Sequence, residues 1–310
     1  MSLRLVLILS ENWTMVGPRD LPALVRMAVD AEQAGADAVM VSEHIVLGPT
    51  ANERGEPANP RDYALPGNQD PATPWPNSLM LLAAIAAATT RVRLVASAVL
   101  APLRHPLLLA KELATVDLLS QGRLVVQPTV SWHRDEYDAL GVSFTKRGEL
   151  LDEHLEAWRA LWSESPTTFE GTHYSFRDVF FEPKAFRPDG PRLWFGGESL
   201  HPRLLRRLVA YGHGFNPLGT PTQEDLDRLA FALRDAGRDP AEVEMVGGTR
   251  GEFLSADRPA DLDRALEAIP PQLERGFRTF CLKPSQFTDD PSEVGPICER
   301  VVARLAELEP

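Results

Sequence analysis

The chain has 310 residues, of which 44% are hydrophobic and 25% charged, so it can bury a large core. Its 32 basic and 44 acidic side chains leave a net charge of −12, which argues against binding to nucleic acid or to an anionic membrane surface. No run of 18 apolar residues exists to span a bilayer, and the spacing of Cys281 and Cys298 suggests neither a disulfide framework nor a zinc site.

The first half of the chain alternates between predicted strands and helices. Residues 3–9 form an apolar run that lacks the cleavage site of a signal peptide, so we expect a strand there and a cytoplasmic protein. A helix then begins at Asp20 and stops at Gly35. Further strands are expected at 36–42, 92–100 and 124–127, and further helices at 79–88, 106–119 and 147–162.

Two segments interrupt this alternation. Residues 48–77 are rich in proline, glycine and asparagine and show no periodicity, which is typical of a long loop that carries function. Aromatic and β-branched residues between 169 and 186 predict a hairpin or short strands within an insertion at 165–190. Both segments are expected to shape the substrate site, so the sequence does not identify the substrate.

The second half resumes the alternation. Strands are expected at 192–195, 214–216, 243–247 and 277–282, and helices at 202–211, 222–236, 259–268 and 292–308. Eight strand–helix pairs predict an α/β fold, a (β/α)₈ TIM barrel, formed by a single domain over residues 1–310. An open doubly wound sheet is the alternative, but the chain contains no GxGxxG and no GxxxxGK[ST].

Catalytic residues of such a barrel follow its strands. His44 is the only histidine at such a place with an adjacent carboxylate, Glu43, and histidine is suited to moving protons near neutral pH. Alternatively, His44 only hydrogen-bonds the loop backbone. Gly196-Gly197, between a strand and a helix, leaves backbone N–H groups free to hold a phosphate, although a tight turn would also use glycines.

Other chemistries find less support in the sequence. The remaining six histidines lack the spacing of a metal site, so we expect no metal, and the GxSxG of many hydrolases is absent. Lys283 at the end of the last strand is a candidate for a Schiff base, but the following Pro284 favours a simple chain turn.

Six stretches occur in family-like order and spacing over roughly residues 1–220. They are residues 41–47, 82–94, 104–123, 135–142, 169–176 and 193–199. In these stretches the chain resembles the bacterial luciferase-like flavin and deazaflavin oxidoreductases, most closely the branch that uses coenzyme F-420. The resemblance implies a (β/α)₈ barrel with an insertion before the fifth strand, and a planar tricyclic ring lying in the barrel mouth.

The resemblance also assigns site residues. The third strand of the family ends in a non-prolyl cis peptide bond, which by spacing falls between Ser97 and Ala98. The family's acidic–histidine pair near the reactive ring carbon matches Glu43 and His44. Its phosphate-binding turn matches the four residues Gly196, Gly197, Glu198 and Ser199.

The chain departs from the family pattern in two places. Gln127-Pro128-Thr129-Val130-Ser131-Trp132 stands where the family usually has Gly-Val-Gly-x-Gly-Trp, so side chains, including that of Thr129, would line the cofactor path. His213 and Phe215 stand where aspartate and tryptophan are common. These changes imply either a shifted cofactor preference or weaker cofactor binding.

We therefore expect an F-420-dependent oxidoreductase that transfers a hydride to or from a small organic carbonyl, alcohol or activated alkene. His44 would handle the substrate proton, Glu43 would orient His44, and the 48–77 loop would close over the substrate. An FMN-dependent monooxygenase that uses O₂ and a barrel that binds flavin or a ligand without turnover are the alternatives. Whether the chain forms a homodimer is left open.

The acidic balance makes one further prediction. A chain with a net charge of −12 that holds an anionic coenzyme needs cations or helix N-termini near the coenzyme. We therefore expect cations or helix N-termini to be concentrated at the barrel mouth, and the 28 arginines to be spread unevenly.

Overall fold

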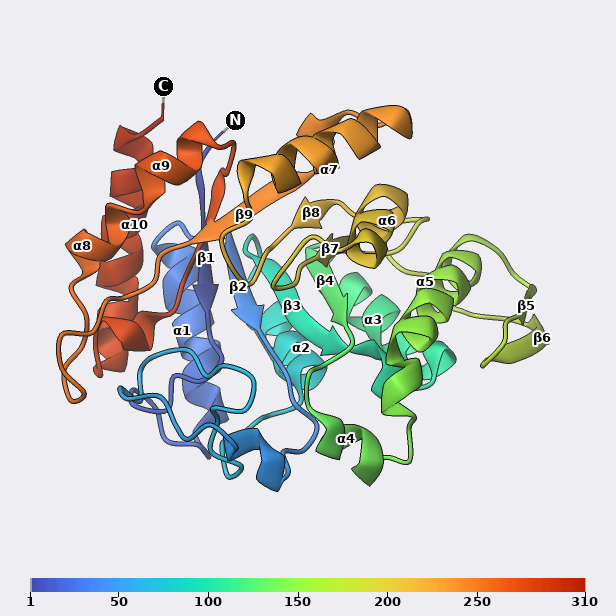
Figure 1. The fold of residues 1–310 in the computed structure, drawn as a ribbon, viewed down its shortest axis with the longest axis horizontal. Coiled ribbons are helices and arrows are strands. Elements are labelled where there is room, and N and C mark those ends of the chain that lie inside the picture. Colours follow the sequence, from blue (N-terminus) through green and yellow to red (C-terminus); the bar gives the residue numbers. More distant parts are fainter. Residues whose placement is uncertain (1, 310) are drawn as a thin grey trace.

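Eight parallel strands close into a barrel in the computed structural model, which describes residues 2–309 (Figure 1). They are β1 (Arg4–Ile8), β2 (Ala38–Val41), β3 (Arg93–Leu100), β4 (Leu124–Thr129), β7 (Arg192–Phe195), β8 (Gly214–Phe215), β9 (Glu244–Gly248) and β10 (Thr279–Leu282). Around the barrel they follow the order β1-β10-β9-β8-β7-β4-β3-β2. The predicted (β/α)₈ barrel is confirmed.

Helices surround the barrel (Figure 1). They are α1 (Leu21–Gln33), α2 (Ser78–Ala88), α3 (Pro106–Leu119), α4 (Arg134–Ala139), α5 (Arg147–Ser163), α6 (Pro202–Tyr211), α7 (Gln223–Asp235), α8 (Leu262–Leu266), α9 (Ile269–Glu274) and α10 (Val294–Glu307). The helix expected at 259–268 is shorter, α8, and the prediction missed α9, which begins just after it. Pro270 and Pro271 lie in the first turn of α9, where proline is tolerated.

The strand residues divide between two cores. In β1, Leu5 and Leu7 pack outward against the helices, whereas Val6 joins a smaller cluster inside the barrel that includes Trp194. This division follows from the alternation of side chains along a strand. Helix ends are defined locally, as at α1, where the Asp20 side chain accepts from the N–H of Ala23.

The insertion contains a two-stranded antiparallel sheet. Its strands are β5 (Thr167–Glu170) and β6 (Ser175–Val179), between α5 and β7, the fifth strand of the barrel by sequence. In Figure 1 this hairpin lies at the right-hand edge, beside α5. The hairpin expected between 169 and 186 is present, and it begins two residues earlier.

A charged cluster closes the N-terminal end of the barrel. Arg93 donates to both oxygens of Glu244, each at 2.8 Å, and its Nε donates to Asp37 at 2.7 Å. Glu244 also accepts from Thr279 at 2.6 Å and from Arg4 at 3.2 Å. Burial opposes ionisation of Glu244, but the hydrogen bonds and charge of Arg93 outweigh it and lower the pKa of this carboxyl.

The strand directions define the two ends of the barrel. In Figure 1 the strands run downward, so the mouth, at their C-terminal ends, lies at the bottom with α4 and the 48–77 loop, and α7 and α9 lie at the top. Loops that follow parallel barrel strands carry the functional groups of such folds, so the site is sought at the bottom. Within residues 2–309 no helix is long and apolar enough to cross a membrane.

Candidate active site

His44 follows β2, and its ring lies next to the carboxylate of Glu136, a residue of α4, the helix that follows β4. Its Nδ1 lies 3.1 Å from Oε2 of Glu136, although the geometry is not that of a straight hydrogen bond. The Glu136 side chain is fully buried, and that of His44 is 10% exposed. Neither ring nitrogen of His44 forms a hydrogen bond within residues 2–309, and Nδ1 is buried. The ring therefore has one nitrogen beside a buried carboxylate and the other available to a substrate.

Glu136 is held in place by two further bonds. Its Oε1 accepts from the backbone N–H of Ile45 at 2.7 Å, and its Oε2 accepts from the hydroxyl of Ser131 at 2.9 Å. Ser131 has a φ of 55°, the left-handed region that glycine adopts without cost. The family's glycine at this position is thus replaced by a residue whose hydroxyl supports the carboxylate beside His44.

Glu43 does not orient His44, which corrects the expectation from sequence. Its oxygens accept from Arg104 Nη1 at 2.7 Å and Nη2 at 3.0 Å, from the Ser78 hydroxyl at 2.8 Å and from the Leu100 N–H at 2.8 Å. This carboxylate is buried beneath the loops. Successive residues that leave a strand point to opposite sides, so adjacency in the chain separates Glu43 from His44.

Aromatic rings surround His44. Trp75, from the 48–77 loop, packs edge-on against it with ring centroids 5.0 Å apart, and Trp132 does so at 5.8 Å. His133 is buried, and its Nε2 accepts from the N–H of Gly48 at 2.7 Å. Burial lowers the pKa of His133, so the neutral ring carries its proton on Nδ1, which has no partner in the described chain. A reactant beside His44 would meet apolar ring surface and few polar groups.

The residues expected behind the ring lie on the barrel floor. The Ser97–Ala98 bond is cis, as the resemblance implies. The Ser97 hydroxyl donates to Oε1 of Gln127 at 3.0 Å, and the same oxygen accepts from Asn216 at 2.9 Å. Gln127, where the family has glycine, therefore fills the floor with a hydrogen-bonded side chain. Thr129 lies further along β4, half-buried and paired with Leu100 of β3.

The turn at residues 196–199 has the features of an anion site. Neither of its two glycines has a positive φ, so a tight turn does not explain them. Gly196 has a packing reason, because a Cβ there would lie 1.8 Å from the Asn216 carbonyl oxygen, whereas a Cβ on Gly197 would meet nothing closer than 3.4 Å. The N–H groups of residues 197–199 donate to no acceptor in the described chain. Three free N–H groups before α6 fit a phosphate.

Cations lie beside this turn. A cavity of about 620 Å³ at the start of α6 is lined by His201, Arg203, Arg206 and Arg228. Arg206 has no ion pair within residues 2–309, so its charge is available, whereas Arg207 is bound to Asp152 at 2.7 Å. Glu198 and Ser199 are exposed. The turn thus suits an anionic group despite the acidic balance of the chain.

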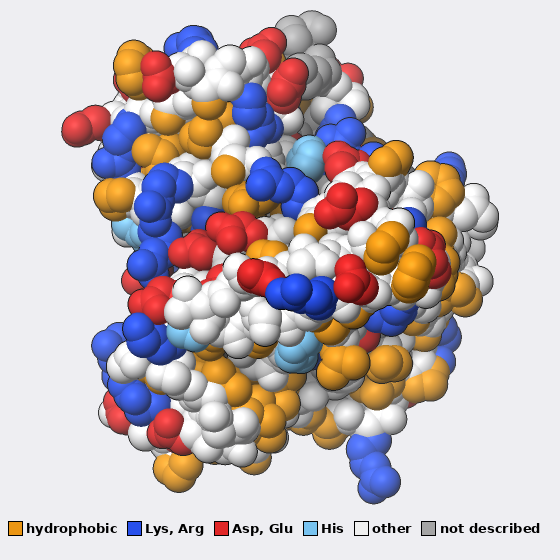
Figure 2. Space-filling model, turned by 90° about the vertical axis from the view of Figure 1, so that its right-hand side faces the viewer, with side chains coloured by type: hydrophobic (Ala, Val, Ile, Leu, Met, Phe, Trp, Pro, Cys, Tyr) orange, Lys and Arg blue, Asp and Glu red, His pale blue; other side chains and the backbone are white. Residues whose placement is uncertain are grey.

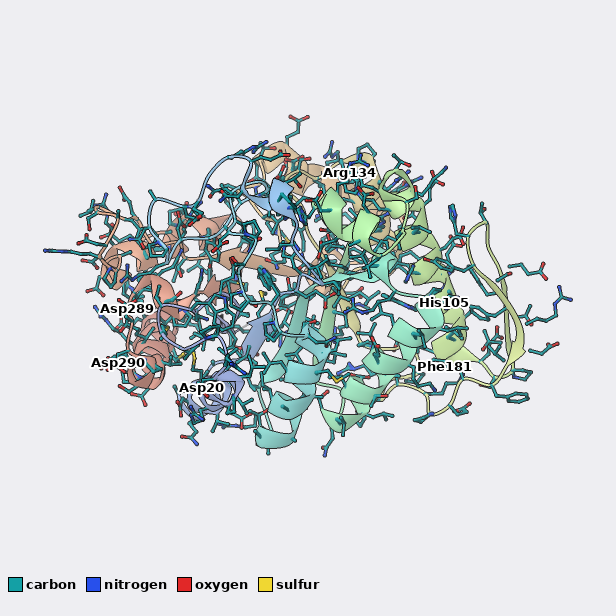
Figure 3. The ribbon with its side chains drawn as sticks, turned by 90° about the horizontal axis from the view of Figure 1, so that it is seen from below. Asp20, His105, Arg134, Phe181, Asp289 and Asp290 are labelled. Carbon is teal, nitrogen blue, oxygen red and sulfur yellow. The ribbon has the colours of Figure 1, made fainter. Side chains whose placement is uncertain are left out.

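The 48–77 loop crosses the mouth. Arg250, after β9, forms an ion pair with Asp62 at 2.8 Å, and Lys283, after β10, donates to the Asp62 carbonyl oxygen at 3.1 Å. At the end of the loop Trp75 reaches His44. Seen from below, the loop and its side chains fill much of the face between α4, marked by Arg134, and the segment of Asp289 (Figure 3). The loop therefore separates the mouth from solvent.

Two ionisable groups, Glu11 and the buried Lys283, lie beside this loop. Burial raises the pKa of Glu11 and lowers that of Lys283, while the two opposite charges partly offset each effect. Lys283 is 1% exposed, and its nitrogen lies 5.3 Å from the ring centre of Tyr63. The bond from Lys283 to the Asp62 carbonyl gives it a loop-anchoring role, so a Schiff base is not needed to explain this lysine.

Sequence reasoning missed Glu136, Trp75 and His133. A signal for Glu136 was present, because residues 135–142 belong to the family-like stretches, but its partner lies 92 positions away. The structure brings Ser97 and Gly196 together around Gln127 and brings His44 to Glu136. It leaves Glu43 outside that pair.

Comparison with known proteins agrees with this fold. Residues 4–290 match the sequence pattern of the luciferase-like monooxygenase family. A related sequence is the phthiodiolone/phenolphthiodiolone dimycocerosates ketoreductase of Mycobacterium tuberculosis. It is 28% identical over 259 residues, which cover 81% of this chain and 66% of that protein.

Two solved structures share the whole architecture. An F-420-dependent secondary alcohol dehydrogenase, in complex with an F-420–acetone adduct, has a TM-score of 0.73 at 18% identity over 98% of this chain and 99% of its own. The oxygenating constituent of 3,6-diketocamphane monooxygenase from Pseudomonas putida, in complex with FMN, has a TM-score of 0.72 at 16% identity and covers 99% of both chains. At these identities the likeness establishes the fold alone.

Proposed function

We propose that this chain, which belongs to the luciferase-like monooxygenase family and is an oxidoreductase, uses coenzyme F-420 to move a hydride to or from the carbonyl carbon of a small organic molecule. The observation that carries this proposal is the His44–Glu136 pair, with Nε2 of His44 unpartnered under the aromatic rings. Reduction of a carbonyl needs a proton at oxygen, and oxidation of an alcohol needs that proton removed.

The coenzyme supplies or accepts the hydride when it is bound. The chain's own residues would bind the coenzyme and transfer the substrate proton. The free N–H groups of residues 197–199 and Arg206 would hold its anionic part, and the floor formed by Ser97, Gln127 and Asn216 would lie against its ring. Both places fit a flavin or a deazaflavin.

His44 would pass the substrate proton at Nε2. In the reduction direction the protonated ring gives that proton to the substrate oxygen, and in the oxidation direction the neutral ring accepts it. The Glu136 carboxylate lies 3.1 Å from Nδ1 and would form an ion pair with the ring when the ring is protonated. The 48–77 loop excludes water while its tethers at Asp62 stay in place.

The related ketoreductase and the F-420-dependent alcohol dehydrogenase support carbonyl chemistry. The FMN-bound neighbour supports the competing proposal, an FMN-dependent monooxygenase, because the phosphate turn would serve either coenzyme. Titration of the purified chain with F-420 and with FMN, followed by fluorescence quenching, separates them. We expect F-420 to bind more tightly.

Two results would contradict this expectation. If FMN binds more tightly and the reduced complex consumes O₂ with a ketone or aldehyde substrate, the monooxygenase proposal replaces ours. If neither coenzyme binds with a Kd below ~100 μM, about −5.5 kcal/mol, both proposals fail and a barrel without turnover remains.

A further inference from the structure

A second cavity lies at the opposite end of the barrel from His44. It measures about 890 Å³, within the size range of small-molecule sites, and lies among the first residues of the barrel strands and α7. Figure 2 draws the right-hand side of the molecule in Figure 1. Basic, histidine and hydrophobic side chains gather in its upper part, at the end of the molecule where Figure 1 shows α7.

Arginines dominate the charge of this cavity. Seven of the chain's 28 arginines line it, against four acidic side chains. Only Arg4 and Arg93 form ion pairs with carboxylates among the described residues, and both pair with Asp37 and Glu244. A quarter of the arginines therefore lie away from the mouth. In an acidic chain this leaves five charges at the N-terminal end that no carboxylate neutralises.

Three side chains in this cavity, Arg187, Arg192 and His213, have N–H groups that donate no hydrogen bond within residues 2–309. Arg192, at the start of β7, is exposed and makes no hydrogen bond or ion pair within residues 2–309. Arg187 donates through Nη2 to the Gly122 carbonyl oxygen at 3.0 Å, but its Nε is buried and unpartnered. Such a buried, unpaired N–H is uncommon in a folded protein and indicates that a partner is missing.

His213 adds a third donor beside them. Its Nδ1 accepts from the N–H of Leu193 at 3.2 Å, so the neutral ring carries its proton on Nε2. Burial lowers the pKa of His213, and the charges of Arg192, Arg238 and Arg187 lower it further against Asp189. These arginines therefore lie close enough to act on the ring. The strands explain the proximity, because β7 and β8 are neighbours in the barrel.

The other wall of the cavity is apolar. Leu226, Leu229 and Leu233 lie on one face of α7 and line the same cavity. Guanidinium groups match the oxygens of phosphates and carboxylates, and an aliphatic wall favours a hydrocarbon group. We propose that this cavity is a binding site for an organic anion, a phosphate or carboxylate that carries a short apolar chain, held by Arg187, Arg192 and His213 and packed against α7.

Calorimetric titration with hexyl phosphate, hexanoate, ethyl phosphate and inorganic phosphate tests this site. We expect hexyl phosphate to bind more tightly than ethyl phosphate and inorganic phosphate to bind most weakly, because only the longer chain reaches the leucines. Comparison of hexyl phosphate with hexanoate identifies the preferred headgroup. This series needs no variant, so it stays informative if a substitution impairs folding.

Variants then locate the site. Arg192→Gln and Arg187→Gln should each weaken hexyl phosphate binding about tenfold, which corresponds to about 1.4 kcal/mol. Arg19→Gln is the matched control, because Arg19 is exposed, forms no ion pair within residues 2–309 and lines neither cavity. Arg206→Gln tests separately whether the anion binds at the turn proposed for the coenzyme. Coenzyme affinity should be the same in wild type and Arg192→Gln.

Several outcomes would overturn the proposal. One is that only Arg206→Gln weakens binding, because the anion then sits beside α6. Others are equal affinities in all variants, no dependence on chain length, or no saturable binding below ~20 mM. Sedimentation that shows a dimer lost in Arg192→Gln without ligand would make the cavity an interface between two copies instead.

Discussion

The two ends of the barrel both bury carboxylates in polar networks, but they use them differently. At the N-terminal end, Glu244 accepts two bonds from Arg93 and others from Thr279 and Arg4. At the mouth, Glu136 accepts from Ile45 and Ser131 and faces His44, whose Nε2 has no partner in the described chain.

This difference suits the two networks to different roles, stability of the fold at the N-terminal end and binding of a reactant at the mouth. A network in which every polar atom is bonded stabilises the fold, because loss of any member leaves a buried group unpaired. A network with one free atom beside a loop can bind a reactant at that atom. Variants at the two ends should therefore move different quantities, stability at one end and turnover at the other.

The largest effect on turnover is expected at His44. His44→Ala removes the group that we propose transfers the substrate proton, so kcat/KM should fall by about 10²–10⁴. The fall is measured as the bleaching or recovery of F-420 absorbance with a panel of ketones and alcohols. Coenzyme affinity, measured by fluorescence quenching, should change little. If affinity falls with turnover, His44 belongs to coenzyme binding and the comparison between the two ends loses its basis.

The largest effect on stability is expected at Arg93. Arg93→Met leaves the partly buried carboxylates of Asp37 and Glu244 without their main partner, which should lower the free energy of unfolding by about 2–3 kcal/mol. Urea unfolding followed by circular dichroism measures it, and turnover per folded molecule should not change. Arg177→Met, which removes an exposed pair with Glu170 on the hairpin, is the control and should change stability little. A loss below ~1 kcal/mol for Arg93→Met would contradict this assignment.

Glu136 offers a sharper test at the mouth. Glu136→Gln keeps an oxygen that accepts from the Ile45 N–H, and its NH₂ group can donate to the Ser131 hydroxyl. It removes the charge beside His44, so kcat should fall about tenfold, about 1.4 kcal/mol, with KM nearly unchanged. Glu43→Gln should instead lower the free energy of unfolding, because it weakens the buried pair with Arg104. If Glu43→Gln lowers kcat and Glu136→Gln does not, the pairing expected from sequence adjacency is restored.

The fold was largely predictable because its signals are local. Alternating and 3.6-residue patterns locate eight strand–helix pairs without knowledge of any contact. The errors have local reasons too. Helices α4 and α9 were missed because each has six residues, too few to show a helical period.

The site was less predictable because its contacts join distant residues. His44 could be predicted because it follows a strand. The carboxylate beside it belongs to Glu136, which follows β4, whereas the sequence pointed to the adjacent Glu43 as its partner. The basic cavity was missed for a similar reason. Arg187, Arg192 and His213 are spaced along the chain like ordinary surface residues, and only closure of the barrel brings them together.

The smallest expected effect is on the pH dependence of stability, through the bond that His133 makes to the start of the 48–77 loop. The pKa of His133 in the folded state lies below its unfolded value near 6.5, because burial disfavours the charged ring. The folded state therefore binds fewer protons than the unfolded state below that pH, so this contribution to stability is complete above pH ~6.5 and declines as the pH falls. Protonation also removes the acceptor for the Gly48 N–H, where the 48–77 loop begins.

Urea unfolding at pH 7 and pH 5.5 should show a loss of at most about 1.4 kcal/mol from this group, and His133→Gln should show a smaller decline than wild type. Parallel declines in the two proteins would mean that His133 does not couple the loop to pH.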